Sequence, residues 1–269
     1  MAVAIQIDDL TRRFDTVTAV NALDLEVRAG EVFGLLGPNG AGKTTTIKML
    51  ITLLPPSGGT ARVAGYDILR EARLVRRSIG YVPQLLSSDG ALTARENLMT
   101  SARLYHLPMA ERQLRIDEAL TFTGLEGAAD RLVRTFSGGM IRRLEIAQAM
   151  LHRPEVLFLD EPTVGLDPIA RRAVWGHIRD LRASEGTTIL LTTHYMDEAA
   201  ELCNRVGIMH LGKLVALGTP AELAAQAGPG KNLDDAFSYF TGAELGEESE
   251  QGGQYRDVAR TRRTARRLG

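Results

Sequence analysis

Apolar and polar residues alternate through the first part of the chain as they do in strands with one buried face. Val3 to Ile7 alternates towards Leu10, and residues 22–27 alternate over six positions. Short, mostly apolar runs, typical of strands buried on both faces, follow at residues 32–36, 156–159 and 187–193. Further strands are expected at residues 60–63, 79–82, 206–210 and 213–217. The pattern predicts a small antiparallel sheet near the N-terminus and a second, mostly parallel sheet.

Helical periodicity replaces the strand pattern between about residues 85 and 134. Thr93 and Glu96 have the spacing of a capping box, in which each side chain bonds the backbone N–H of the other. A second helix is expected to begin after Pro108 and to close at Gly124. We interpret this stretch as an α-helical subdomain inserted into an α/β core.

The remaining helices have recognisable starts. Ser137 precedes an amphipathic helix, and Asp167-Pro168 has the N-cap and first-turn residues of another helix, which ends at Gly186. Short helices are expected after Pro220 and over residues 232–240. Strands that alternate with helices in this order indicate an α/β fold.

We expect one α/β domain over residues 1–223 and a C-terminal extension over residues 224–269, although the length is also compatible with two domains. The extension begins as helix and then becomes charged. Its glutamates precede its arginines: Glu244, Glu247, Glu248 and Glu250, then Arg256, Arg260, Arg262, Arg263, Arg266 and Arg267. A mobile, solvated tail is favoured, and attraction of the arginines to an anionic membrane is the alternative.

Composition narrows the classes of protein that fit. A formal net charge of −1 argues against general affinity for nucleic acid, so no nucleic-acid partner is expected. Cys203 is the only cysteine, which excludes an internal disulfide and suits a reducing compartment. No leader is expected at Met1, and the apolar runs are far shorter than the roughly 20 residues of a membrane span. If the protein works at a membrane, we expect another component to anchor it.

The phosphate-loop pattern of Gly, four residues and Gly-Lys-Thr is met by Gly37-Pro38-Asn39-Gly40-Ala41-Gly42-Lys43-Thr44-Thr45. It follows a predicted strand and precedes a helix expected near residues 45–53. Backbone N–H groups of such a loop and the positive end of the helix bind phosphate oxygens. Lys43 is expected to neutralise the β- and γ-phosphates of a nucleotide, and Thr44 to ligate Mg²⁺.

Two carboxylates follow the buried run at residues 156–159. Asp160 suits a Mg²⁺ ligand, because it is expected to stand beside Thr44 at the end of the neighbouring strand, and Glu161 could deprotonate an attacking water. Gln84 ends another predicted strand, where its amide could reach the metal site, although a solvated glutamine is the plainer interpretation. The same strand-end argument brings His194 to the γ-phosphate.

Weaker signals leave two interpretations open. Phe14 could stack on adenine or belong to the small sheet. Ser137-Gly138-Gly139 could form a second anion site at a helix start or serve as a simple cap, and Asp167 is equally well explained as a cap.

The order of these motifs resembles the nucleotide-binding subunit of an ATP-binding cassette (ABC) transporter, over residues 3–223. The resemblance implies a P-loop NTPase core that hydrolyses ATP to ADP and phosphate with Mg²⁺. It also implies seven elements: an adenine-stacking Phe14, Walker A at residues 37–45, a Q-loop at Gln84, the signature at residues 136–140, Walker B at residues 156–161, a D-loop at residues 165–167 and a switch histidine at His194.

Details of the sequence resemble one subfamily, the bacterial exporters of the daunorubicin-resistance type. The signature reads Phe136-Ser137-Gly138-Gly139-Met140 where the family usually has Leu-Ser-Gly-Gly-Gln. The stretches at residues 194–199 and 214–220 carry the same subfamily likeness. Ser137, Gly138 and Gly139 are retained, so phosphate binding by the signature is expected to survive.

One Walker lysine and one separate helix-start anion site suggest a head-to-tail dimer that sandwiches two ATP molecules. The resemblance implies the same assembly, with an identical chain or a related cassette as partner. It further implies membrane permease subunits as partners and a peripheral place on the cytoplasmic face of the cell membrane. The alternative is a soluble ABC ATPase that acts on nucleic acid or ribosomes.

Overall fold

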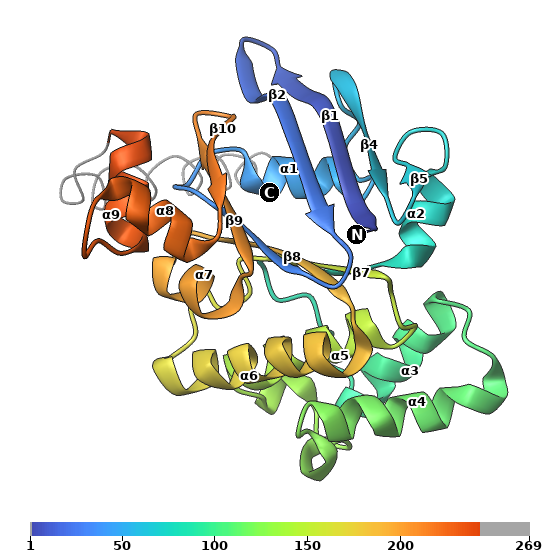
Figure 1. Ribbon diagram of the computed structural model, residues 1–269. Helices are drawn as coiled ribbons and strands as arrows, with labels where there is room; N and C mark the ends of the chain where they lie inside the picture. Colours follow the sequence, from blue (N-terminus) through green and yellow to red (C-terminus); the bar gives the residue numbers. More distant parts are fainter. Residues whose placement is uncertain (1, 243–269) are drawn as a thin grey trace, which may run out of the picture.

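The computed structural model describes residues 2–242 and contains two β-sheets (Figure 1). The smaller sheet is antiparallel, with strand order β2-β1-β4-β5. Its strands are β1 (Val3–Phe14), β2 (Val17–Arg28), β4 (Gly58–Val63) and β5 (Tyr66–Asp67). Within β2, Leu23, Leu25 and Val27 are buried and the residues between them are exposed, as the alternating pattern predicts.

The larger sheet has strand order β10-β9-β3-β8-β7-β6. Its strands are β3 (Val32–Leu36), β6 (Ile79–Val82), β7 (Val156–Asp160), β8 (Thr188–Thr193), β9 (Arg205–His210) and β10 (Lys213–Gly218). All neighbours are parallel except β9 and β10, which form a hairpin. Because parallel strands end at the same edge, the segments that follow β3, β6, β7 and β8 meet there.

Helices cover both faces of the larger sheet. They are α1 (Lys43–Leu50), α2 (Ala72–Ser78), α3 (Ala94–Leu104), α4 (Met109–Phe122), α5 (Gly138–Met150), α6 (Pro168–Glu185), α7 (Met196–Leu202), α8 (Pro220–Ala227) and α9 (Leu233–Thr241). Figure 1 shows the small sheet on one side and α3, α4, α5 and α6 on the other. The P-loop NTPase core, the antiparallel sheet and the helical insertion are thus all present. Among residues 2–242, no helix combines the length and apolar character that a bilayer span requires.

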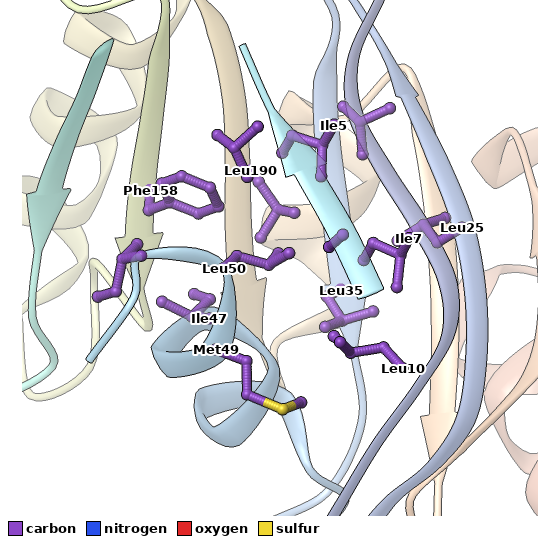
Figure 2. Close-up of a cluster of buried hydrophobic side chains, with 14 of the residues drawn as sticks. Ile5, Ile7, Leu10, Leu25, Leu35, Ile47, Met49, Leu50, Phe158 and Leu190 are labelled. Atoms are coloured by element: carbon purple, nitrogen blue, oxygen red, sulfur yellow. The ribbon is translucent and has the colours of Figure 1, made fainter. Parts of the chain in front are cut away.

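Two apolar clusters lie on the two faces of the larger sheet. The first joins the antiparallel sheet, α1 and side chains such as Phe158 and Leu190 (Figure 2). The second joins the opposite face, including Leu157 and Leu159, to α5, α6, α7, α8 and α9. Cys203 is buried here against Gly34, where a Cβ atom would lie 2.7 Å from the cysteine Sγ. Burial raises the pKa of the Cys203 thiol.

A third cluster forms inside the helical subdomain. Leu98 of α3, Ile116 of α4 and Leu144 of α5 belong to it, so the subdomain packs onto the helix that follows Ser137. The capping box at Thr93 and Glu96 is confirmed. The expected helix at residues 45–53 begins two residues earlier and ends at Leu50.

The expected C-terminal extension, residues 224–269, begins as helix and is described as far as residue 242. The boundary placed after residue 223 falls inside α8, and Leu223, Leu233 and Phe237 are buried in the same cluster as α6 and α7. The helices α8 and α9 therefore pack on the α/β core as far as the structure describes the chain. The arginine-rich segment that was expected to be mobile lies outside the described residues.

Replacing Leu223 by alanine is expected to destabilise the whole domain by about 2–5 kcal/mol, because the side chain is fully buried in the second cluster. Urea unfolding followed by circular dichroism measures the change. Leu114→Ala on the exposed face of α4 is the control, with an expected change within about 0.5 kcal/mol. A Leu223→Ala protein as stable as this control would show that α8 is not part of the cooperative unit.

Candidate functional site

The phosphate loop is shaped by close contacts with neighbouring strands. Gly42 has φ 104°, a conformation that side chains disfavour, and a Cβ atom there would lie 2.4 Å from the carbonyl oxygen of Ala19 in β2. The N–H of Gly212, in the β9–β10 turn, donates to the Ala41 carbonyl at 3.1 Å. The loop is therefore held from both sheets. Gly42 caps α1 without a side chain, so the first N–H groups of the helix have no side-chain acceptor at the cap.

Replacing Gly42 by alanine is expected to destabilise the loop by about 1–3 kcal/mol through backbone strain, with a further loss from the contact with Ala19. Nucleotide affinity should fall with it. Gly65→Ala is a matched control, because Gly65 has φ 80° but a Cβ atom added there would meet no atom within 4 Å, so only the strain applies. Denaturant unfolding and nucleotide titration measure both effects. Equal losses in the two variants would contradict the close-contact argument.

Lys43 and Glu161 form a buried ion pair at the loop. Lys43 Nζ lies 3.3 Å from Glu161 Oε1, and both side chains are at most 5% exposed. The ammonium also donates to the carbonyls of Gly37 at 2.7 Å and Pro38 at 3.1 Å. Burial lowers the pKa of Lys43, and the charge of Glu161 opposes that effect. A buried cation thus lies at the phosphate loop, an arrangement that suits a multiply charged phosphate.

The Glu161 carboxylate is also held by two other residues expected at the site. Gln84 Nε2 donates to Oε2 at 3.1 Å, and His194 Nδ1 lies 3.3 Å from the same oxygen. Burial alone would raise the pKa of Glu161, but the His194 contact and the charge of Lys43 outweigh it and hold this pKa below its ordinary value. Glu161 therefore stays ionised at neutral pH, as a proton acceptor must.

Asp160 faces Thr44, but the strand arrangement differs from the prediction. From the sequence, β3 and β7 were expected to be neighbours, whereas β8 lies between them. Thr192 of β8 bridges the gap with a hydroxyl that donates to Asp160 Oδ1 at 2.6 Å, while Thr44 Oγ1 donates to the same oxygen at 3.0 Å. The carboxylate is 1% exposed. These hydroxyl and carboxylate oxygens are ligands of the kind that Mg²⁺ prefers.

Glu161 lies on a strained turn. Its φ is 48°, and its N–H donates to the Thr192 carbonyl at 3.1 Å and to the Thr192 hydroxyl at 3.0 Å. Non-glycine residues rarely adopt this conformation, which here directs the carboxylate away from β7 and towards Lys43. Sequence reasoning missed Thr192, because a threonine inside a buried strand carries no signal of its own.

The other predicted residues lie apart from this cluster. Phe14 ends β1 and is 42% exposed, with the Arg12 guanidinium 4.5 Å from its ring centre. Its hairpin continues into β2, whose Ala19 contacts the phosphate loop at Gly42.

The two predicted caps, Ser137 and Asp167, lie at adjacent helix starts. Ser137 Oγ accepts from Met140 N–H at 3.3 Å, and Asp167 Oδ1 accepts from two N–H groups of α6 at 2.9 Å. The close approach of α5 to α6 requires a glycine at position 139, since a Cβ atom there would lie 2.7 Å from the Ala170 Cβ. Ser137 and Gly138 are exposed, so this pair of helix starts is open to a partner.

A second buried ion pair, which the sequence analysis missed, lies next to Gln84. Arg142 of α5 is 1% exposed and pairs with Glu145 at 2.9 Å. It donates to the carbonyls of Pro83 at 2.6 Å and Gln84 at 2.8 Å. The signal for this pair was two opposite charges three residues apart in an amphipathic helix, a spacing that usually indicates a solvated pair.

The fold and the site together define a nucleoside-triphosphate hydrolase. It has a phosphate loop, two adjacent carboxylates at the end of β7 and an inserted helical subdomain. Residues 20–164 match the family model described as ABC transporter, and the chain belongs to that family.

Curated relatives agree with this assignment. The chain is 48% identical over 225 residues to the daunorubicin/doxorubicin resistance ATP-binding protein of Streptomyces peucetius, covering 84% of this chain and 68% of that protein. It is 45% identical over 222 residues to the Nod factor export ATP-binding protein I of Paraburkholderia xenovorans, covering 82% and 73%. A solved dimeric bacterial ABC transporter cassette shares 25% identity with a TM-score of 0.72, covering 80% of this chain and 98% of that one.

The predicted family, fold class and ATPase activity are confirmed. The chain is the ATP-binding and ATP-hydrolysing subunit of an ABC transporter, of the drug-resistance and export type. Subunits of this family dimerise and work with membrane permeases. None of these relatives supports the alternative of an ATPase that acts on nucleic acid or ribosomes.

Proposed function

We propose that this chain drives export of drugs or other hydrophobic small molecules through a separate permease, with Glu161 as the base of its ATPase reaction. The proposal that Glu161 is the base rests on one observation: its carboxylate is held ionised between Lys43, Gln84 and His194. The cargo class is supported by the relative from Streptomyces peucetius, which is named for resistance to daunorubicin and doxorubicin.

In the proposed reaction, Glu161 takes a proton from the attacking water as the water oxygen bonds to the γ-phosphorus. The bond from that phosphorus to the β–γ bridging oxygen breaks, and its electron pair stays on ADP. Lys43 and the loop N–H groups of residues 37–45 bind the β- and γ-phosphates. His194 and Gln84 contact the carboxylate oxygen that faces them and orient the water and the γ-phosphate.

Mg²⁺ fits the residues present. Thr44 Oγ1 and Asp160 Oδ1 are 3.0 Å apart and would hold the ion, which supplies neutralisation of phosphate charge when bound. The third proposed ligand, Gln84, turns its amide nitrogen to Glu161, so its carbonyl oxygen is the atom left for the metal. We propose Phe14 as the adenine contact, because its ring is exposed on the hairpin that touches the phosphate loop.

The position of the helix start at Ser137 supports the assembly of two cassettes. Ser137, Gly138 and Gly139 lie beside Asp167, and within residues 2–242 the polar partners of Lys43 are Gly37, Pro38 and Glu161. We propose that they cover the γ-phosphate bound by Lys43 of a second cassette, either identical or related. ATP would then favour the closed pair through contacts that the open pair lacks. The permease would hold the assembly at the cytoplasmic face of the cell membrane.

Purification from membranes under mild detergent tests the transport assignment. A permease with several membrane spans is expected to co-purify with the chain, and ATPase activity in reconstituted vesicles should rise with daunorubicin. Recovery with ribosomes or DNA, and not with a membrane protein, would contradict the proposal. Vesicles without the permease are the control for drug effects on the ATPase itself.

A further inference from the structure

The segment that carries Gln84 is fixed to one face of α5. Arg142 donates to the Pro83 and Gln84 carbonyls, and Glu145 accepts from the N–H of Ser87 and, at 3.1 Å, from its hydroxyl. One turn further along, Gln148 Oε1 accepts from the Ser88 hydroxyl at 2.8 Å. Residues 142, 145 and 148 lie three apart, so they share one helix face.

The Arg142–Glu145 pair is buried on every side. Both side chains are 2% exposed, so neither charge is solvated and each depends on the other and on the backbone of the Gln84 segment. The same helix packs closely on β6, where a Cβ atom on Gly80 would lie 2.4 Å from the Ala149 carbonyl oxygen. The strand, the Gln84 segment and α5 are thereby held together.

This arrangement connects the helix start at Ser137 to the Gln84 side chain, and the proposed mechanism gives both a role. The helix α5 begins at Ser137, and the Gln84 amide reaches the Glu161 carboxylate at 3.1 Å. In the described part of the chain, two side chains between them bond the main chain of residues 83–87: Arg142 donates to the Pro83 and Gln84 carbonyls, and Glu145 accepts from the Ser87 N–H.

We propose that Arg142 and Glu145 are positioning residues: they lock the Gln84 segment to the helix that starts at Ser137, so that displacement of this helix start moves the Gln84 amide at Glu161. The proposal rests on the proposed roles of Gln84 and Glu161 in ATP hydrolysis. A purely structural pair would stabilise the domain without acting through Gln84.

The test compares Arg142→Lys, Arg142→Met and the paired variant Arg142→Met/Glu145→Leu in the full chain. Lysine keeps the charge but cannot donate to two carbonyls and Glu145 in the same planar geometry. The paired variant leaves no uncompensated charge and guards against a failure to fold. Arg143→Met is the matched control, since Arg143 on the same helix donates to the Thr123 carbonyl, away from Gln84.

We expect kcat for ATP to fall about 10- to 100-fold in the Arg142 variants, with KM and equilibrium ATP affinity unchanged. The readout that separates positioning from stability is a double-mutant cycle with Gln84→Ala. In that background the Arg142 substitutions should cost little further activity, because the side chain they position is gone. An equal loss of kcat with and without Gln84 would overturn the proposal, as would full activity in folded Arg142 variants.

Amide hydrogen exchange gives a measurement that does not require hydrolysis. Exchange at residues 84–88 is expected to rise at least about tenfold in Arg142→Met/Glu145→Leu and to stay unchanged in Arg143→Met. Unchanged exchange in the paired variant would overturn the lock itself. A wild-type chain that fails to hydrolyse ATP would overturn the proposed function instead.

Discussion

Replacing Lys43 by alanine is expected to abolish nucleotide binding at micromolar protein. The ammonium is 4% exposed and lies among the phosphate-loop carbonyls, so its removal takes away the one buried cation at the loop among the described residues. Losing one partner of a buried, hydrogen-bonded charge pair costs about 2–5 kcal/mol, or about 30- to 5000-fold in affinity. Titration with a fluorescent ATP analogue measures it.

Lys48→Ala is the control for this prediction. Lys48 lies on the exposed face of the same helix, so its loss changes the helix charge equally but removes no contact at the loop. Circular dichroism should confirm that both variants fold. ATP affinity that is unchanged in Lys43→Ala would refute the assignment of residues 37–45 as the nucleotide cradle.

Replacing Glu161 by glutamine is expected to keep ATP binding but to slow hydrolysis by about 100-fold or more, the usual contribution of a general base. The amide preserves the size of the side chain and can still contact Gln84 and His194, but it cannot take a proton from water. With hydrolysis blocked, Mg-ATP should hold two chains together. Gel filtration with and without Mg-ATP measures the dimer, and phosphate release measures the rate.

Glu155→Gln is the matched substitution, since Glu155 precedes the opposite end of β7 and is exposed. It should hydrolyse ATP at the wild-type rate and show no trapped dimer. A Glu161→Gln chain that stays monomeric with Mg-ATP would rule out the ATP sandwich, while one that hydrolyses ATP normally would rule out Glu161 as the base.

Local signals in the sequence were sufficient for much of the fold and for the centre of the site. The Gly-Lys-Thr spacing placed Lys43 and Thr44, and the buried strand ending in two carboxylates placed Asp160 and Glu161 beside them. Helix caps such as Thr93 are equally local, because cap and helix lie within four residues. Such features depend on neighbours in the chain, which a sequence displays directly.

Features that depend on strand order were not predictable in the same way. The insertion of β8 between β3 and β7, and with it the role of Thr192, depends on long-range pairing that no local pattern specifies. The burial of Arg142 and Glu145 likewise depends on where the Gln84 segment packs. The domain boundary proposed after residue 223 depends on packing in the same way, because only tertiary contacts show which apolar cluster α8 joins.

The burial of Cys203 makes the protein suitable for labelling at an introduced cysteine. The only thiol in the chain lies against Gly34 inside the second apolar cluster, 8% exposed and with a raised pKa, so reagents that attack thiolates have little access to it. A cysteine introduced at an exposed position such as Leu53 would then be the single site of attachment for a dye or spin probe. Distances between two such probes, one in each cassette, could be followed through the ATP cycle without first removing a native thiol.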